Sequence, residues 1–296
     1  MMSRLSSVVK QHPLITFFVL AYALSWSLES QLVFLGDSVS DTQSLVLVLL
    51  ASNVPSVVAI VLTAIVLGRE SVRKLLGRLL IWRVDPRWYL VVVGPAALTG
   101  GVVGLNALLG GPALSVDVSL LTAMIMLALS IFPGSALGEE IGWRGYALPR
   151  LQAGRSALNA SLILGVIWAL WHLPLYFTGQ AFRSLSLFAP FVVATIALSV
   201  ILTWVYNSTG GSLLLVVLIH ATFNLPLTLI LAPLGSRATV PFLLWCGLMV
   251  VTAIVVVVVA GPKHLSRKQR KQDEPSEISP KSLVYEAQPE AQPQAQ

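Results

Sequence analysis

Two adjacent carboxylates follow directly on a long apolar run in this sequence. The run covers residues 118–137, Glu139 and Glu140 come just after it, and Arg144 lies four residues beyond Glu140. Ionisable side chains at membrane depth are rare, and they normally face a protein interior or a hydrated cavity where they find partners. If a helix continues through the motif, Glu140 and Arg144 share a face and can pair. Glu139 is then rotated by about 100° to another face, which leaves its carboxylate available for chemistry.

Two histidines lie in other apolar segments. His172 follows Trp168 by four residues, and His220 precedes Asn224 by four residues. A carboxylate beside an imidazole can hold and deprotonate a water molecule. A second imidazole with a carboxamide one helical turn away can donate to the oxyanion that forms on an attacked carbonyl group. If the three segments meet, their side chains predict hydrolysis by an activated water, with Glu139 as the activating group.

The sequence leaves the role of a metal open. Cys246 lies in the last apolar run, and no base near Ser135 in the sequence could activate it, so neither predicts a nucleophile. Glu139, His172 and His220 could instead bind a divalent metal such as zinc, which takes carboxylate and imidazole ligands and keeps a fourth position for water. The His-Glu-x-x-His motif is absent, so the ligands would come from three separate helices.

The composition is that of a multi-pass membrane protein. Hydrophobic residues make up 56% of the chain and charged residues only 11%, against roughly 25% charged residues in soluble domains. A membrane helix needs about 20 apolar residues, and such long runs exclude a transmembrane barrel. We therefore expect an all-α polytopic membrane helix bundle of about eight transmembrane helices. The expected spans are residues 13–35, 44–67, 88–109, 118–138, 157–177, 187–206, 213–231 and 240–260.

The chain divides into one membrane domain and a tail. Residues 1–260 form the expected transmembrane domain, and the candidate catalytic residues fall in its core at 118–231. Residues 261–296 are rich in Pro, Gln and Glu and predict a disordered cytoplasmic tail. Lys and Arg gather at the N-terminus, in alternate loops and after the last span, so both termini are expected in the cytoplasm. The expected location is a cell membrane, of the bacterial plasma membrane type.

The basic residues that serve as orientation signals account for the net charge of +6, so no nucleic-acid partner is expected. The expected partners are membrane lipids and a peptide or protein substrate, whose lipidation the sequence leaves undecided. Two segments have secondary predictions: residues 69–88 suit an amphipathic helix on the headgroups, and Glu29 suits a side chain that extends from a helix end to the interface.

The depths of the polar residues do not agree fully. His220 lies about 10 Å along its helix from Leu213, close to the expected depth of Glu139 near the cytoplasmic side. His172 lies about 22 Å from Ala157 by the same rise, and so deeper than its expected partners. Pro133 falls inside the fourth span and predicts a kink just before the carboxylates.

Together the three motifs resemble those of the CPBP intramembrane proteases, a family that includes CAAX prenyl endopeptidases and bacteriocin-processing or immunity proteins. The resemblance covers residues 118–231. Many members have Phe where this chain has Trp168, which we interpret as a conservative aromatic change. The matching motifs are Glu139-Glu140-x-x-x-Arg144, Trp168-x-x-x-His172 and His220-x-x-x-Asn224.

The resemblance implies an intramembrane endopeptidase that hydrolyses peptide bonds near the cytoplasmic face. It leaves open whether the mechanism uses a metal or a Glu/His-activated water, and it does not extend the prenylated substrates of the eukaryotic-type branch to this chain. Alternatives are a non-catalytic membrane scaffold or bacteriocin-immunity protein, and an ion- or proton-coupled transporter. The implied catalytic residues are Glu139, His172 as its partner, and His220 with Asn224 on the oxyanion side, supported by Glu140 and Arg144.

Overall fold

The computed structural model describes residues 9–111, 113–114, 118–178 and 184–267. Within these ranges every regular element is helical. The longer helices are α2 (Pro13–Leu35), α3 (Asp41–Gly77), α5 (Gly94–Leu108), α6 (Leu120–Ile131), α9 (Ala157–Trp171), α10 (Leu185–Ser208), α11 (Leu213–Pro226) and α12 (Thr239–Ala260). The short elements are η1 (Gly36–Ser38), η2 (Arg78–Leu80), α4 (Arg87–Val92), α7 (Ser135–Glu140), η3 (Ile141–Ala147), α8 (Leu148–Gln152), η4 (Leu173–Phe177), η5 (Leu227–Leu231) and η6 (Ala232–Ala238).

The predicted all-α membrane bundle is confirmed. Among the described residues, seven helical stretches are long and apolar enough to cross a membrane. Some of them join consecutive elements, as α4 with α5 (Arg87–Leu108) and α11 with η5 (within Leu213–Gly235). An eighth apolar helix, α9, has only 15 residues, fewer than the about 20 of a full span, because the end of the expected span 157–177 forms the 3-10 turn η4. The chain is therefore a multi-pass membrane protein with one short helix among its full-length ones.

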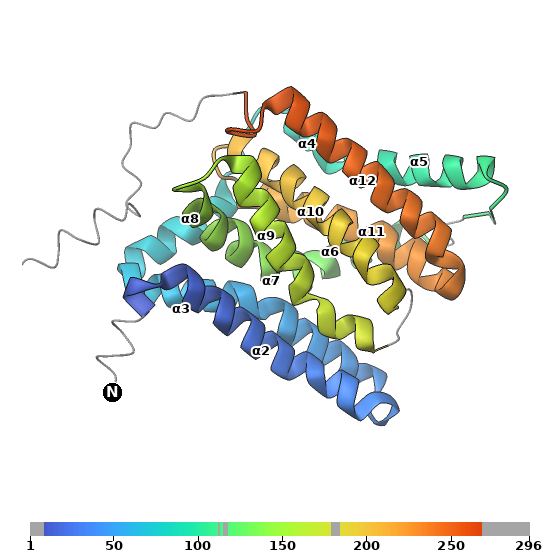
Figure 1. Cartoon of the computed structure of the whole chain (residues 1–296), viewed down its shortest axis with the longest axis horizontal. Helices are drawn as coiled ribbons and strands as arrows, with labels where there is room; N and C mark the ends of the chain where they lie inside the picture. The colour runs from blue at the N-terminus through green and yellow to red at the C-terminus, as the bar shows by residue number, and fades with distance from the viewer. Residues whose placement is uncertain (1–8, 112, 115–117, 179–183, 268–296) are drawn as a thin grey trace, which may run out of the picture.

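Figure 1 shows the helices lying side by side as a bundle. Helix α2 packs against α3, α10 packs against both α9 and α12, and α7 contacts both α3 and α11. Helix α2 begins and α12 ends toward the same side of the bundle. Which side faces the cytoplasm stays a prediction from the distribution of basic residues.

Serine caps set where two of the site-bearing helices begin. The side chain of Ser156 accepts a hydrogen bond from the Asn159 amide at the start of α9, and Ser212 accepts one from Leu215 at the start of α11. Such caps satisfy backbone amides that have no partner within the helix. By fixing the first turn of α11, Ser212 also sets the position of His220 two turns further along.

The predicted interruption at Pro133 is confirmed. Helix α6 ends at Ile131, Phe132 and Gly134 have extended backbone, and α7 begins at Ser135. Proline lacks the amide hydrogen that would continue the helix, and it favours an extended residue before it. The carboxylates are therefore carried by a short separate helix rather than by the end of α6.

The prediction of an amphipathic helix over residues 69–88 is wrong in its second half. Helix α3 extends to Gly77 and continues into η2, but residues 81–86 are not helical. Gly68 separates the last part of α3, residues 69–77, from its membrane-spanning part. Its φ of 80° and ψ of 177° interrupt the helix, and glycine adopts this conformation readily.

Glu29 does not extend to the interface as predicted. Its side chain is buried, with 1% exposed, within α2, which packs against α3 and the turn η4. The prediction considered α2 alone. It is wrong because α3 and η4 cover the side of the helix on which Glu29 lies.

The first residues of the predicted tail are held against the bundle. The carbonyl groups of Lys263 and Pro262 accept hydrogen bonds of 2.9 and 3.1 Å from the first two amides of α9. These bonds satisfy amide groups that a helix leaves without internal partners. Residues 261–267 thus close one end of the bundle, and the rest of the predicted tail, residues 268–296, lies outside the described residues.

Candidate active site

Glu140 and Arg144 form a buried ion pair. Both side chains are 0% exposed, and Arg144 Nη1 lies 2.8 Å from Glu140 Oε1. The pair spans the point where α7 passes into η3, whose turns are π-helical, a conformation found frequently at functional sites. The pairing predicted from the spacing of four residues is confirmed. Each charge makes the burial of the other tolerable.

His220 joins this pair from α11. Its Nδ1 lies 2.8 Å from the same oxygen of Glu140. Because an ionised carboxylate can only accept, the hydrogen of this bond is on Nδ1, and the lone pair of the neutral ring is on Nε2. Glu140 therefore links the first motif to the third and fixes which ring nitrogen of His220 can act on a substrate.

Glu139 makes a separate interaction. It is 2% exposed, and its Oε2 accepts a hydrogen bond of 2.5 Å from Nε1 of Trp168. The sequence predicted His172 as its partner, whereas this bond comes from Trp168, one turn earlier on α9. The two adjacent carboxylates thus have different partners: Glu140 has two cationic or ionisable groups, and Glu139 has a neutral indole.

His172 ends α9 and is half-buried. Its Nδ1 lies 2.9 Å from the carbonyl oxygen of Trp168, which can only accept, so Nδ1 carries the hydrogen and Nε2 the lone pair of the neutral ring. The ring makes T-shaped contacts with Trp171 and Phe191, at centroid distances of 4.8 and 5.1 Å. Its centroid lies 6.1 Å from that of Trp168.

The sequence placed His172 deeper in the membrane than Glu139 and His220, and the contacts of Trp168 explain this difference. Trp168 lies about 16 Å along α9 from its start, one turn less than His172 and closer to the depth of His220. The long indole side chain of Trp168 bridges from α9 to Glu139. Trp168 of the second motif therefore makes the hydrogen bond to Glu139 of the first, and His172 lies one turn further along α9.

Asn224 lies one turn beyond His220, as its spacing predicts. Its Nδ2 donates a hydrogen bond of 3.0 Å to Oγ of Ser135 at the start of α7. An amide is not a base, so this contact does not make Ser135 a nucleophile. Both residues are half-buried. Their hydrogen bond connects α7 to α11 at the more exposed side of the site.

The site contains buried polar atoms without partners among the described residues. They are Oε2 of Glu140 and both Nε and Nη2 of Arg144. Buried polar atoms normally have hydrogen-bond partners, so a water molecule or a polar group of a substrate would satisfy them. His172 and Asn224 are the more exposed members of the site, which indicates the side from which such a group would enter.

The residues considered for zinc do not fit a metal site in this arrangement. Across the described ranges, no three His, Cys, Asp or Glu side chains gather as a possible metal-binding group. A zinc site needs three such ligands around one point.

Helix α3 holds the carboxylate-bearing helix at very close range. A Cβ atom added to Gly138 would lie 2.6 Å from the carbonyl oxygen of Ser52, and one added to Gly142 would lie 2.7 Å from that of Pro55. Glycine permits this approach of two backbones. Helix α3 was not predicted as part of the site, although these glycines one turn apart beside the carboxylates are a signal of close packing.

Two polar side chains of α3 reinforce this contact. Ser56 Oγ donates a hydrogen bond of 2.9 Å to the carbonyl oxygen of Leu137, and Asn53 Nδ2 donates one of 2.8 Å to that of Pro133. The Pro133 carbonyl lies where the break before α7 removes regular helical bonding. These bonds help to orient α7, and polar residues inside the second apolar span were the signal for them.

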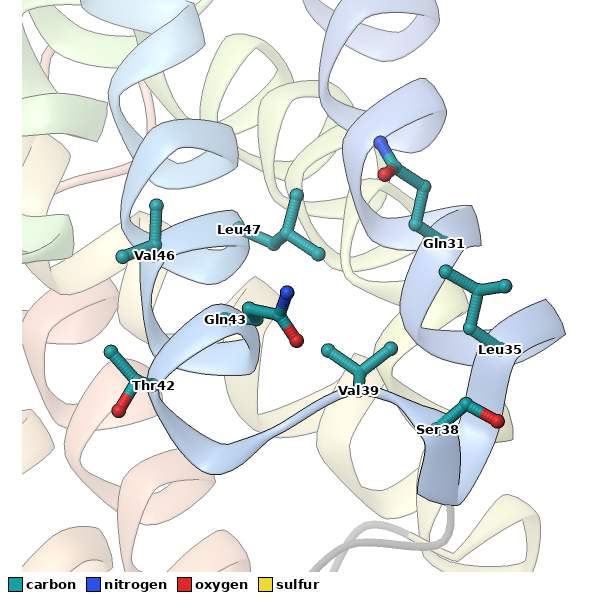
Figure 2. A pocket seen from close by; sticks show the side chains of 8 residues that line it. All are labelled: Gln31, Leu35, Ser38, Val39, Thr42, Gln43, Val46 and Leu47. Atoms are coloured by element: carbon teal, nitrogen blue, oxygen red, sulfur yellow. The ribbon is translucent and has the colours of Figure 1, made fainter.

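A pocket elsewhere carries no such chemistry. Figure 2 shows it at the turn between α2 and α3, away from the elements that bear the three motifs. None of its lining residues is ionisable, so it offers no general acid or base. They are Gln31, Leu35, Ser38, Val39, Thr42, Gln43, Val46 and Leu47.

Comparison with known proteins agrees with the motif resemblance. Residues 119–226 match the model of the Type II CAAX prenyl endopeptidase Rce1-like family, a range that contains Glu139, His172, His220 and Asn224. The protein called CAAX prenyl protease 2 from Methanococcus maripaludis is 30% identical over 132 residues, which are 43% of this chain and 46% of that relative. The chain thus matches less than half of the relative's length.

Proposed function

From the match of residues 119–226 to the Rce1-like CAAX prenyl endopeptidase family, we propose that this chain is an intramembrane endopeptidase of that family. The proposed reaction is hydrolysis of a peptide bond by a water molecule that Glu139 activates. The observation that carries the proposal is the contrast between the two acids. Glu140 is neutralised in a buried ion pair, whereas Glu139 binds only a neutral donor among the interactions described above.

In the proposed mechanism Glu139 acts as the general base. Its Oε2 is held by Trp168, so Oε1 would hold the water. As the water oxygen bonds to the peptide carbonyl carbon, Glu139 takes its proton. It returns this proton to the leaving amine when the C–N bond breaks. The products are a carboxylic acid and an amine, and transfer of the acid's proton to the amine gives a carboxylate and an ammonium group. The Nε2 lone pair of His172 would accept a hydrogen bond from the water or the amine and orient it.

The third motif would stabilise the oxyanion. Asn224 can donate from Nδ2 by exchanging its bond to Ser135 for one to the substrate oxygen. His220 donates from Nδ1 to Glu140, so a bond from its Nε2 to the oxyanion requires the doubly protonated ring. Arg144 supports the arrangement by holding Glu140 in place.

A test compares purified protein with its variants in lipid nanodiscs. The probes are a farnesylated peptide ending in Cys, two aliphatic residues and a variable residue, and the same peptide without the lipid, with products identified by mass spectrometry. We expect Glu139→Gln and His172→Ala to abolish cleavage. Glu70→Gln, which changes an exposed acid on the same chain, should cleave as the native protein does.

The same variants test the substrate in cells. Membrane proteomes of cells that carry the native protein or Glu139→Gln should differ in accumulated precursors, which would identify the natural substrate and its cleavage site. Full proteolysis by Glu139→Gln would contradict the proposed mechanism. Rescue of the gene's phenotype by that variant would favour a scaffold, and ion flux that depends on Glu139 without peptide cleavage would favour a transporter.

A further inference from the structure

Trp168 contacts polar residues of all three motifs. Its indole N–H donates to Glu139, and the guanidinium carbon of Arg144 lies 4.2 Å from the centroid of its ring. Its ring makes a T-shaped contact with His220 at 5.3 Å, and its carbonyl oxygen binds Nδ1 of His172. The side chain is buried, with 2% exposed. It was interpreted above as a conservative substitute for Phe, and these contacts show more than packing.

We propose that Trp168 is a positioning residue for the hydrolysis, acting through its indole N–H. The proposal rests on the proposed function of Glu139 as the base. By holding Oε2, the indole N–H fixes the rotation of the Glu139 carboxylate and directs Oε1 toward the water. Phe, which many proteins with similar motifs have here, has no donor, so this bond is a property of chains with Trp at this position.

The chemistry of the bond supports this role. A hydrogen bond to an ionised acceptor is roughly twice as strong as one between neutral groups, and the bond here is short. The indole ring cannot rotate freely, because Arg144 lies over its face and the ring of His220 makes a T-shaped contact with it. A donor held in this way restricts the carboxylate more than a mobile side chain would. Misplacement of a catalytic group by about 1 Å can reduce the rate about a hundredfold.

Trp168→Phe removes the indole N–H and leaves a smaller ring beside Arg144 and His220. An aromatic ring remains, and so does the backbone carbonyl that sets the protonated nitrogen of His172. Trp143→Phe is a matched control, because Trp143 is also buried, with 0% exposed, and its indole N–H has no partner among the described residues. Both variants lose the same atoms, but only the first loses a hydrogen bond.

The kinetic test measures kcat and KM of both variants with the peptide that the native protein cleaves. We expect Trp168→Phe to lower kcat by about tenfold to a hundredfold, the loss of one hydrogen bond to a charged group, with KM changed by less than about threefold. Trp143→Phe should keep kcat within about threefold. Equal effects of the two variants would overturn the proposal and leave a packing role. Activity of Glu139→Gln would instead overturn the proposed function.

A spectroscopic test does not depend on turnover. In nanodisc samples labelled with 15N-tryptophan, the indole resonance of Trp168 is assigned by its loss in Trp168→Phe, or in Trp168→Tyr if the first variant does not fold. Glu139→Gln should shift this resonance and leave that of Trp143 in place, because the charged acceptor is lost. An unchanged Trp168 resonance would overturn the proposal even if Glu139 proves essential for cleavage.

Discussion

Replacing Gly142 by alanine tests whether helix α3 sets the position of the carboxylate-bearing helix. The added Cβ would lie 2.7 Å from the carbonyl carbon and oxygen of Pro55 and 2.8 Å from its Cβ. Carbon atoms in contact are normally about 3.5–4.0 Å apart. Because the obstructing atoms belong to the backbone and to a ring, no side-chain rotation can relieve the contact. Helix α3 and the turn η3 must therefore separate by about 1 Å.

The expected effect follows from two opposing terms. Overpacking of this kind destabilises by about 1–3 kcal/mol, and alanine in place of glycine stabilises a helix by roughly 0.8–1.0 kcal/mol. Gly100→Ala in α5 measures the second term alone, because its Cβ would meet no atom within 4 Å. The free energy of unfolding of Gly142→Ala should thus lie about 1–3 kcal/mol below that of Gly100→Ala.

Gly145→Ala makes the comparison a graded series. Its Cβ would lie 2.8 Å from Cδ1 of Leu75 and 3.2 Å from Cδ1 of Leu213, which are ends of flexible side chains that can move. Denaturant unfolding of the detergent-solubilised variants should rank Gly100→Ala as most stable, Gly145→Ala as intermediate and Gly142→Ala as least stable. Equal stability of Gly142→Ala and Gly100→Ala would refute the close backbone contact.

Three further predictions concern other parts of the structure. Arg144→Gln should lower the free energy of unfolding by about 3–5 kcal/mol, because Glu140 stays buried without its cation; a loss below about 1 kcal/mol in denaturant unfolding would contradict the pair. Asn207→Ala removes the 2.8 Å bond to the His264 carbonyl and should speed tryptic cleavage within residues 261–267, whereas equal cleavage in both proteins would show that the segment is held by other contacts. Treatment with a zinc chelator should leave the peptidase rate unchanged, since no three possible ligands gather among the residues that the structure describes. Loss of activity that added zinc restores would require a different arrangement.

The features that the sequence predicted depend on local geometry. The ion pair of Glu140 and Arg144 follows from a spacing of four residues in any helix, and the interruption at Pro133 follows from the missing amide hydrogen. The helices themselves follow from the length of the apolar runs. Each of these inferences needs only one segment of the chain, and the structure bears them out.

The features that the sequence did not predict depend on how segments pack. Burial of Glu29 requires the neighbouring elements that cover α2, and no single-span pattern contains them. The bond from Trp168 to Glu139 requires α9 and α7 to meet at one level. An aromatic residue in an apolar helix is compatible with packing, a membrane interface or a hydrogen bond, and only the tertiary arrangement distinguishes these roles.

The same tertiary arrangement gives two neighbouring carboxylates different electrostatic surroundings. Glu140 has Arg144 and His220 on one of its oxygens, so its charge is compensated and serves to hold other groups. Glu139 receives a hydrogen bond from a neutral indole, and His220 and Arg144 act on its charge only through space. A general base needs a fixed direction and a carboxylate that is not engaged in a direct ion pair. A neutral donor provides the direction, whereas a cation in the same place would oppose the proton transfer, and this difference is why we assign the chemistry to Glu139.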